Sequence, residues 1–409
     1  MARILLVLIA LLAAALAPAA APAAALGAGP AGTRAALAAQ MRLAGGGSSA
    51  LAVDLDSGRT IYASRAGSPR TPASVNKLFT TSTALTLYGV DGHLTTTVLG
   101  DVGVDPGGVL IGNLYLRGGG DPEFGAAEAA ALADELVVAG GLREITGRVI
   151  GDEAAFDSLR GPPSEGYRTT NEVGPLSALT FNRGRTGARR PFWQRTPALF
   201  AARAFARALE RRGVAIGRAA REGRTPPTAL PLAERSSATM ADLARLTNRP
   251  SDNFNAETLI KALGAEFGAR GTTRAGAGVV RRTMTGFGLR PRIADGSGLS
   301  RANRTTPRQV VRLLQHMAGD PAGPAFDASL AVAGRSGTLE YRMRGSAAHD
   351  RCHAKTGTLN SVSALAGYCR SAAGARVAFA FLMNGVNVSA ARALQDRMTA
   401  ALARYAPWS

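Results

Sequence analysis

A serine and a lysine three residues apart, Ser74 and Lys77, form the first pair in this sequence that could perform covalent chemistry. Residues 75–88 have a helical pattern, so both side chains would lie on one face, one turn apart, near a helix N-terminus. A serine hydroxyl is a weak nucleophile that needs an adjacent base, and a buried lysine with a lowered pKa can act as that base. The alternative is a helix-capping serine beside a solvated lysine, and for this pair alone that alternative is favoured.

Lysine is rare in this chain, which makes its positions informative. The chain has 48 lysines and arginines, and its lysines are Lys77, Lys261 and Lys355. Arginine keeps its proton at working pH, whereas a desolvated lysine can lose it. A lysine that persists in such a composition is therefore a candidate for a role that arginine cannot fill. Lys77 belongs to the pair above, and Lys355 opens a second motif.

The second motif is Lys355-Thr356-Gly357, on a predicted strand. Its lysine offers a fixed cation, its threonine a hydroxyl, and its glycine a place where a substrate backbone could approach closely. The tripeptide alone is a weak signal, because Lys-Thr-Gly can also be an ordinary strand end.

The third motif is Ser251-Asp252-Asn253, on a loop between two predicted helices. It supplies a hydroxyl and an amide, and alone it is weaker still, since Ser-Asp-Asn is a common turn or cap. The three motifs in this order, each on the expected element, are a strong indication of a serine acyl-transfer enzyme.

The elements that must position these motifs are mixed. The pattern predicts helices at 33–43, 75–88, 197–211, 240–246, 254–263, 306–317 and 389–405, and strands at 49–54, 60–63, 352–358, 362–368 and 376–383. From about residue 95 to about 234 the apolar runs are short and glycine and proline are frequent. We interpret this stretch as a β-rich insert.

The only cysteines, Cys352 and Cys369, are predicted to form a structural disulfide. If Asn360 and Ser361 are the central residues of the turn between the two strands, the cysteines face each other across an antiparallel pair. Alternation then places the bridge on the opposite face from Lys355. The alternative is two buried free thiols, because a one-residue error in the turn breaks the alignment.

The N-terminal segment and the net charge indicate where in the cell the protein acts. Residues 1–25 combine a basic start, an apolar run and small-residue cleavage sites, which predicts a secretory signal peptide rather than a membrane anchor. No later segment is apolar enough to span a membrane. The net charge is +19, but the arginines are scattered, and export argues against nucleic acid as a partner. The charge is compatible with an anionic wall environment.

These motifs resemble those of the class C low-molecular-mass penicillin-binding proteins, the D-alanyl-D-alanine carboxypeptidase/endopeptidases, over nearly all of the mature chain. The resemblance also includes the runs at 118–122, 177–179, 295–301, 337–339 and 367–368. It implies an α/β (α+β) fold: a penicillin-binding/β-lactamase-like transpeptidase domain, an antiparallel sheet flanked by helices, formed by 26–94 and 235–409. Residues 95–234 would be a β-rich inserted domain.

The resemblance also implies roles for the motif residues. Ser74 would attack the D-Ala-D-Ala carbonyl, Lys77 would take its proton, and Ser251 and Asn253 would relay protons and hold the peptide. The residues implied to bind substrate are Lys355, Thr356, Gly357 and Thr358. Backbone N–H groups of Ser74 and Thr358 would form the oxyanion hole. Peptidoglycan stem peptides would be the substrate and β-lactams the inhibitors.

No cofactor or metal is expected. His349 and His353 are four residues apart but lack an evident third ligand. A β-lactamase would share all three motifs, but no Glu-x-x-Leu-Asn pattern lies between Ser251 and Lys355. A catalytically idle wall-binding or sensor protein is the other alternative, and the intact motifs argue against it. A Ser-His-Asp hydrolase is disfavoured because no Gly-x-Ser-x-Gly run surrounds the serine.

Overall fold

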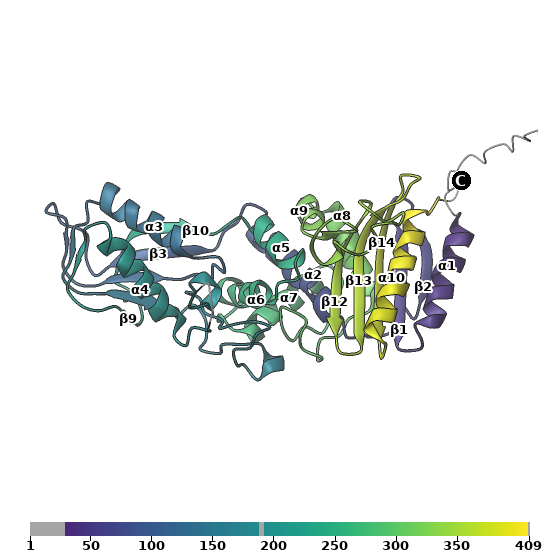
Figure 1. Ribbon diagram of the computed structural model, residues 1–409, viewed down its shortest axis with the longest axis horizontal. Coiled ribbons are helices and arrows are strands. Elements are labelled where there is room, and N and C mark those ends of the chain that lie inside the picture. The colour runs from purple at the N-terminus through teal and green to yellow at the C-terminus, as the bar shows by residue number, and fades with distance from the viewer. Residues whose placement is uncertain (1–28, 188–191, 408–409) are drawn as a thin grey trace, which may run out of the picture.

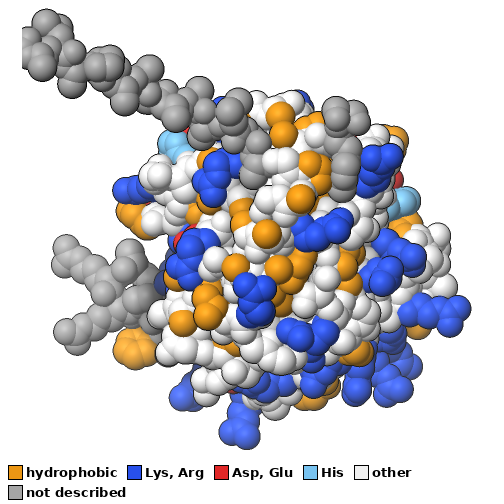
Figure 2. All heavy atoms as spheres, turned by 90° about the vertical axis from the view of Figure 1, so that its right-hand side faces the viewer, with side chains coloured by type: hydrophobic (Ala, Val, Ile, Leu, Met, Phe, Trp, Pro, Cys, Tyr) orange, Lys and Arg blue, Asp and Glu red, His pale blue; other side chains and the backbone are white. Residues whose placement is uncertain are grey.

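The computed structural model describes residues 29–187 and 192–407 and is elongated, with a separate sheet at each end (Figure 1). The predicted signal segment, 1–25, lies outside the described residues. Within the described ranges no helix is both long enough and apolar enough to cross a membrane. Figure 2 shows the end that carries α1 and α10, where basic side chains are scattered and acidic ones are scarcely in view.

A six-stranded sheet forms one end of the molecule, and every neighbouring pair in it is antiparallel. Its order is β11 (Ala331–Val332), β12 (Cys352–Leu359), β13 (Val362–Arg370), β14 (Arg376–Asn384), β1 (Ser48–Asp54) and β2 (Thr60–Ser64). Helices cover both faces, so the central strands are buried along almost their whole length, with no alternation between buried and exposed residues. The predicted strands are thereby confirmed, as is the fold class of an antiparallel sheet flanked by helices.

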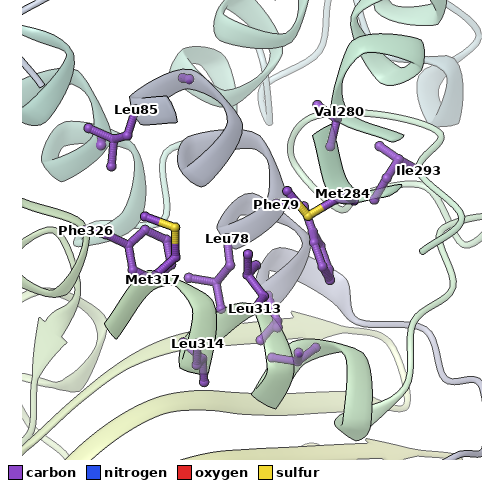
Figure 3. Close-up of a cluster of buried hydrophobic side chains, with 14 of the residues drawn as sticks. Leu78, Phe79, Leu85, Val280, Met284, Ile293, Leu313, Leu314, Met317 and Phe326 are labelled. Atoms are coloured by element: carbon purple, nitrogen blue, oxygen red, sulfur yellow. The ribbon is translucent and has the colours of Figure 1, made fainter. Parts of the chain in front are cut away.

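One face of this sheet packs against α1 (Pro30–Leu43) and α10 (Val388–Ala403). The other face packs against a helical layer: α2 (Lys77–Tyr88), α5 (Met240–Asn248), α6 (Asn253–Phe267), α7 (Thr273–Gly286), α8 (Pro307–Gly319) and α9 (Gly323–Ala328). In Figure 3 the α2 residues Leu78 and Phe79 lie among Met284 of α7 and Leu313 and Leu314 of α8.

Two sequence expectations about the helices need correction. The helix predicted over 75–88 begins as a 3-10 turn, η1 (Ala73–Asn76), and becomes α-helical at Lys77. Ser74 therefore lies in a tight turn before the α-helix and not at its first residue. No helix is predicted over α7, although its apolar spacing is amphipathic and Thr272 caps its N-terminus.

The other end of the molecule is built by residues 95–236, which we call the insert. Its five-stranded sheet has the order β10 (Leu230–Ser236), β3 (Thr95–Gly100), β5 (Leu114–Arg117), β7 (Val149–Asp152) and β9 (Arg221–Glu222). A three-stranded sheet joins β4 (Val109–Leu110), β6 (Glu144–Ile145) and β8 (Ala215–Ile216). Two helices, α3 (Ala126–Asp134) and α4 (Pro197–Glu210), share a separate apolar core with these sheets.

Short helical turns complete the described chain. They are the π-turn η2 (Glu135–Ala139) and the 3-10 turns η3 (Pro163–Glu165), η4 (Asn182–Gly184) and η5 (Gly337–Leu339). Two of them, η4 and η5, lie beside the candidate site described below.

The predicted disulfide between Cys352 and Cys369 is confirmed. Leu359 pairs with Val362, so the turn has two central residues and the cysteines fall directly opposite each other. Both sulfur atoms belong to the core on the α1 and α10 face, whereas Lys355 points by alternation to the opposite face.

Candidate active site

The nucleophile candidate, Ser74, lies in a strained turn. Its neighbour Ala73 has a φ of 47°, a left-handed conformation that costs a residue with a Cβ about 1 kcal/mol. Gly298 packs against this turn so closely that a Cβ there would overlap the carbonyl oxygen of Ala73. The turn is therefore held from outside by the loop 295–298.

Lys77 is fully buried, and its Nζ has three oxygen partners. These are Ser74 Oγ at 2.9 Å, Asn253 Oδ1 at 2.7 Å and the carbonyl oxygen of Ser297 at 2.8 Å. An amide oxygen and a backbone carbonyl can only accept, so a neutral Lys77 would donate to both and turn its lone pair toward Ser74. Burial lowers the pKa of Lys77 to about 8, against the opposing charge of Asp295. The arrangement can therefore deprotonate Ser74 near neutral pH.

A buried carboxylate lies behind Lys77. Oε1 of Glu257 accepts hydrogen bonds from the backbone N–H groups of Gly296 at 3.0 Å and Ser297 at 2.7 Å, while its Oε2 is buried without a hydrogen-bond partner in the described chain. Burial, and then the charge of Asp295, raises the pKa of Glu257 to about 7. Glu257 thus fixes the backbone of Ser297, whose carbonyl oxygen accepts from Lys77. It is not among the predicted site residues, although it lies one helical turn after Asn253 on α6.

The turn between α5 and α6 brings the third predicted motif to the same place. Ser251 has a φ of 65°, again left-handed, and Asp252 caps α6 by accepting from the N–H of Asn255 at 2.8 Å. That cap sets the first residue of the helix, Asn253, against Lys77. The structure therefore brings together Ser74, Lys77 and Asn253, with Ser251 on the wall of the same cleft.

Lys355 lies on β12, which packs against the Ser74 turn. Its Nζ donates to the carbonyl oxygen of Thr356 at 2.9 Å, and Thr356 Oγ1 donates to Thr338 Oγ1 at 2.8 Å. Burial, together with the charge of Lys77, holds the pKa of Lys355 well below its usual range.

Gly357 has a packing role besides the substrate-binding role that the resemblance implies. A Cβ at this position would lie 2.6 Å from the carbonyl oxygen of Pro72 and 3.1 Å from the nitrogen of Ser74. The space beside Gly357 is therefore filled by the Ser74 turn itself. The glycine lets β12 and the nucleophile turn pack together.

These residues border a cleft of about 440 Å³. Its lining residues come from several segments that are distant in sequence: Ser74, Glu172, Ser251, Asn253, Leu299, Thr338, Arg342, Thr356, Thr358 and Arg392. Lys77 and Lys355 lie buried behind this wall.

Three charged lining residues were missed by the sequence analysis. Glu172 comes from the insert and accepts from Asn253 Nδ2 at 3.3 Å. At the other end Arg392 Nη2 donates to Thr358 Oγ1 at 3.0 Å, and Arg342 forms an ion pair of 2.6 Å with Asp396. Arginine occurs throughout the chain, so no spacing singled out these two.

Among the described residues, no group of three or more His, Cys, Asp or Glu side chains is positioned to hold a metal ion. His353 instead pairs with Asp327, its Nδ1 lying 3.1 Å from Oδ1.

Comparison with known proteins assigns the chain to a family. Residues 33–190 and 187–405 match the family described as D-Ala-D-Ala carboxypeptidase 3 (S13). A D-alanyl-D-alanine carboxypeptidase from an Actinomadura species is 32% identical, with 89% of this chain and 82% of the relative covered. Carboxypeptidase DacB of Mycolicibacterium smegmatis is 31% identical, with 85% and 78% covered.

A solved structure gives the same fold. Penicillin binding protein 4 of Haemophilus influenzae superposes with a TM-score of 0.76 at 21% identity, with 88% of this chain and 97% of that one covered. The same protein in complex with a novel β-lactam gives a TM-score of 0.72. At this identity the likeness concerns the fold.

Proposed function

Because the chain belongs to the D-Ala-D-Ala carboxypeptidase 3 (S13) family, we propose that this serine-type D-Ala-D-Ala carboxypeptidase acts on peptidoglycan stem peptides through an acyl-enzyme on Ser74. The observation that carries the proposal is the 2.9 Å hydrogen bond between Lys77 Nζ and Ser74 Oγ, at the wall of a cleft.

In the first half-reaction, neutral Lys77 takes the proton of the Ser74 hydroxyl as its oxygen attacks the carbonyl carbon of the D-Ala-D-Ala bond. The oxyanion is met by the backbone N–H groups of Ser74 and Thr358. When the intermediate collapses, the C–N bond breaks and the proton on Lys77 passes to the leaving amine, with Ser251 as the relay. Water then attacks the ester, gives up a proton to Lys77, and releases Ser74 with that proton returned.

The cationic end of the cleft supports recognition of the substrate's terminal carboxylate. Lys355 and Thr356 bind this group. Arg392 and Arg342 line the same cleft. The carboxylate thus meets Lys355 and two guanidinium groups.

β-Lactams would acylate the same serine and act as inhibitors. The predicted signal segment and the peptidoglycan substrate support action outside the cytoplasm, in the periplasm or the cell-wall space. The scattered basic surface of Figure 2 suits an anionic wall polymer.

Digestion of monomeric and cross-linked muropeptides, followed by product masses, tests the proposal. We expect monomeric pentapeptides to lose one terminal alanine with the wild-type enzyme and to remain intact with Ser74→Ala. Products from the cross-linked substrate would add an endopeptidase activity. Intact pentapeptides after incubation with folded wild-type enzyme would reject the proposal.

A further inference from the structure

Besides Glu172, which lines the cleft, the insert places Arg183 against the first turn of α6 beside the catalytic motif. Its Nη2 donates to Asp252 Oδ2 at 2.5 Å, and its Nη1 donates to Asn255 Oδ1 at 2.8 Å. The guanidinium also lies 5.1 Å from the centre of the Phe254 ring. On the insert side, Nη1 donates to Glu123 Oε1 at 2.5 Å. Arg183 therefore connects the insert to the first turn of α6.

The backbone that presents Arg183 is strained. Asn182 and Arg183 have φ values of 48° and 56°, left-handed conformations that residues with a Cβ adopt at a cost. The turn is braced by Gln194, whose Nε2 donates to the carbonyl oxygens of Phe181 at 2.8 Å and Arg185 at 2.9 Å. A rigid turn of the insert thus aims the guanidinium at α6.

The target of this guanidinium is a residue that positions the catalytic motif. Asp252 caps α6 with Oδ1 and accepts from Arg183 with Oδ2, so hydrogen bonds fix both carboxylate oxygens. The next residue, Asn253, accepts the hydrogen bond from Lys77 Nζ. A shift of Asp252 would therefore move an acceptor of the catalytic base.

The insert also contacts α6 farther along the helix, away from the motif. Lys261 Nζ lies 2.6 Å from Asp157 Oδ1 and donates to the carbonyl oxygen of Leu159 at 2.5 Å. This contact also docks the insert on α6. The ion pair at Arg183 is therefore one of several contacts between the insert and α6, and it lies directly beside the motif.

We propose that Arg183 is a positioning residue for the acylation step: it holds the turn 251–253 so that Asn253 and Ser251 meet Lys77 and Ser74 in a reactive arrangement. The insert is then part of the catalytic apparatus, although it supplies no nucleophile or base. This inference rests on the proposed function, because it assumes acylation of Ser74.

The test is the saturating rate constant for acylation by a fluorescent penicillin, together with the reagent's dissociation constant and the melting temperature. Arg183→Met should lower the rate constant by about ten- to a hundred-fold, because a small displacement of reacting groups is costly. Initial binding should change by less than about threefold. Arg183→Lys keeps the charge but loses the planar guanidinium with its two donor nitrogens, so its acylation rate constant should lie between those of the wild type and Arg183→Met.

Arg212→Met is the matched control. Arg212 binds both oxygens of Asp134 within the insert, at 2.6 and 2.7 Å, and does not contact α6. Its acylation rate should stay within about twofold of the wild type. If Arg183→Met does not fold, Asp252→Asn removes the same ion pair while retaining a cap, and should show the same loss.

The outcomes separate the two proposals. Absence of acylation in the wild type would reject the proposed function. Wild-type acylation with an unchanged rate constant in folded Arg183→Met or Asp252→Asn would reject only the positioning role. Combining the two substitutions should add little to the effect of either alone, and full additivity would also overturn the inference.

Discussion

Lys77 on α2 and Lys355 on β12 are both completely buried beside one cleft, yet their surroundings differ. Lys77 donates to three oxygen atoms and lies near buried carboxylates, and its pKa falls to about 8. Lys355 donates to one backbone oxygen and feels the charge of Lys77, and its pKa falls well below the usual range. Equal burial thus gives two kinds of lysine, because the partners decide how much of the desolvation cost is offset.

The difference separates two tasks. Nearby carboxylates offset part of the desolvation of Lys77, so its pKa of about 8 lets it accept and release a proton, as a general base must. Lys355 lies on β12 beside the cleft, and its Nζ donates to a backbone oxygen rather than to Ser74, which suits substrate binding. Substitutions on each side should therefore disturb different kinetic constants.

The largest expected effect is that of Lys77→Arg. Arginine retains the positive charge but cannot act as a base, so acylation by a β-lactam should fall by about a thousandfold or more. Lys261→Arg is the matched control, since Lys261 is the third buried lysine and pairs with Asp157 outside the site. Near wild-type acylation in Lys77→Arg, measured by stopped-flow fluorescence, would show that another group is the base.

Lys355→Arg should have a smaller effect of a different kind. A cation remains to meet the carboxylate, so we expect a loss of about tenfold in kcat/KM that resides mainly in KM. Steady-state kinetics with a D-Ala-D-Ala peptide measure the split. A loss confined to kcat would remove the distinction between the two lysines.

Arg392→Gln should weaken only the recognition of a charged terminus. For a peptide with a free carboxylate we expect kcat/KM to fall by roughly fivefold, because an exposed charge contributes about 1 kcal/mol. The same peptide with an amide terminus should be unaffected. Arg397→Gln is the control, since Arg397 lies on α10 and contacts Gln40 instead of the cleft. Equal losses for both peptides would contradict this assignment.

The smallest effect concerns the pH profile. Lys77 must be neutral to act, so acylation should rise with pH through about 8 and then level off. Glu257 favours the charged form of Lys77, so Glu257→Gln should lower the lysine pKa and move the rise to lower pH. The rate measured between pH 5 and 10 tests this. A shift to higher pH would mean that Glu257 does not act on Lys77 through its charge.

Local patterns predicted five strands of the six-stranded sheet, most helices and the disulfide. The pairing of Cys352 with Cys369 follows from a two-residue turn, which depends on few neighbours. The spacing of Ser74 and Lys77 likewise places both groups without reference to the rest of the chain.

The parts that could not be predicted depend on long-range packing. Glu172 and Arg183 reach the site only because the insert docks on α6, and no local motif marks either residue. Nothing in the local sequence distinguishes Arg392 from the other arginines, because it reaches the cleft only when the terminal helix packs beside β12. The 3-10 turn at Ser74 also depends on distant contacts with Gly298 and Gly357.

Peptide mapping of a β-lactam adduct tests the central claim most directly. The wild-type protein incubated with a β-lactam should gain the mass of one ligand, located on the peptide that contains Ser74. Folded Ser74→Ala should gain none. An adduct on any other residue, or one that persists in Ser74→Ala, would contradict the assignment of Ser74 as the nucleophile.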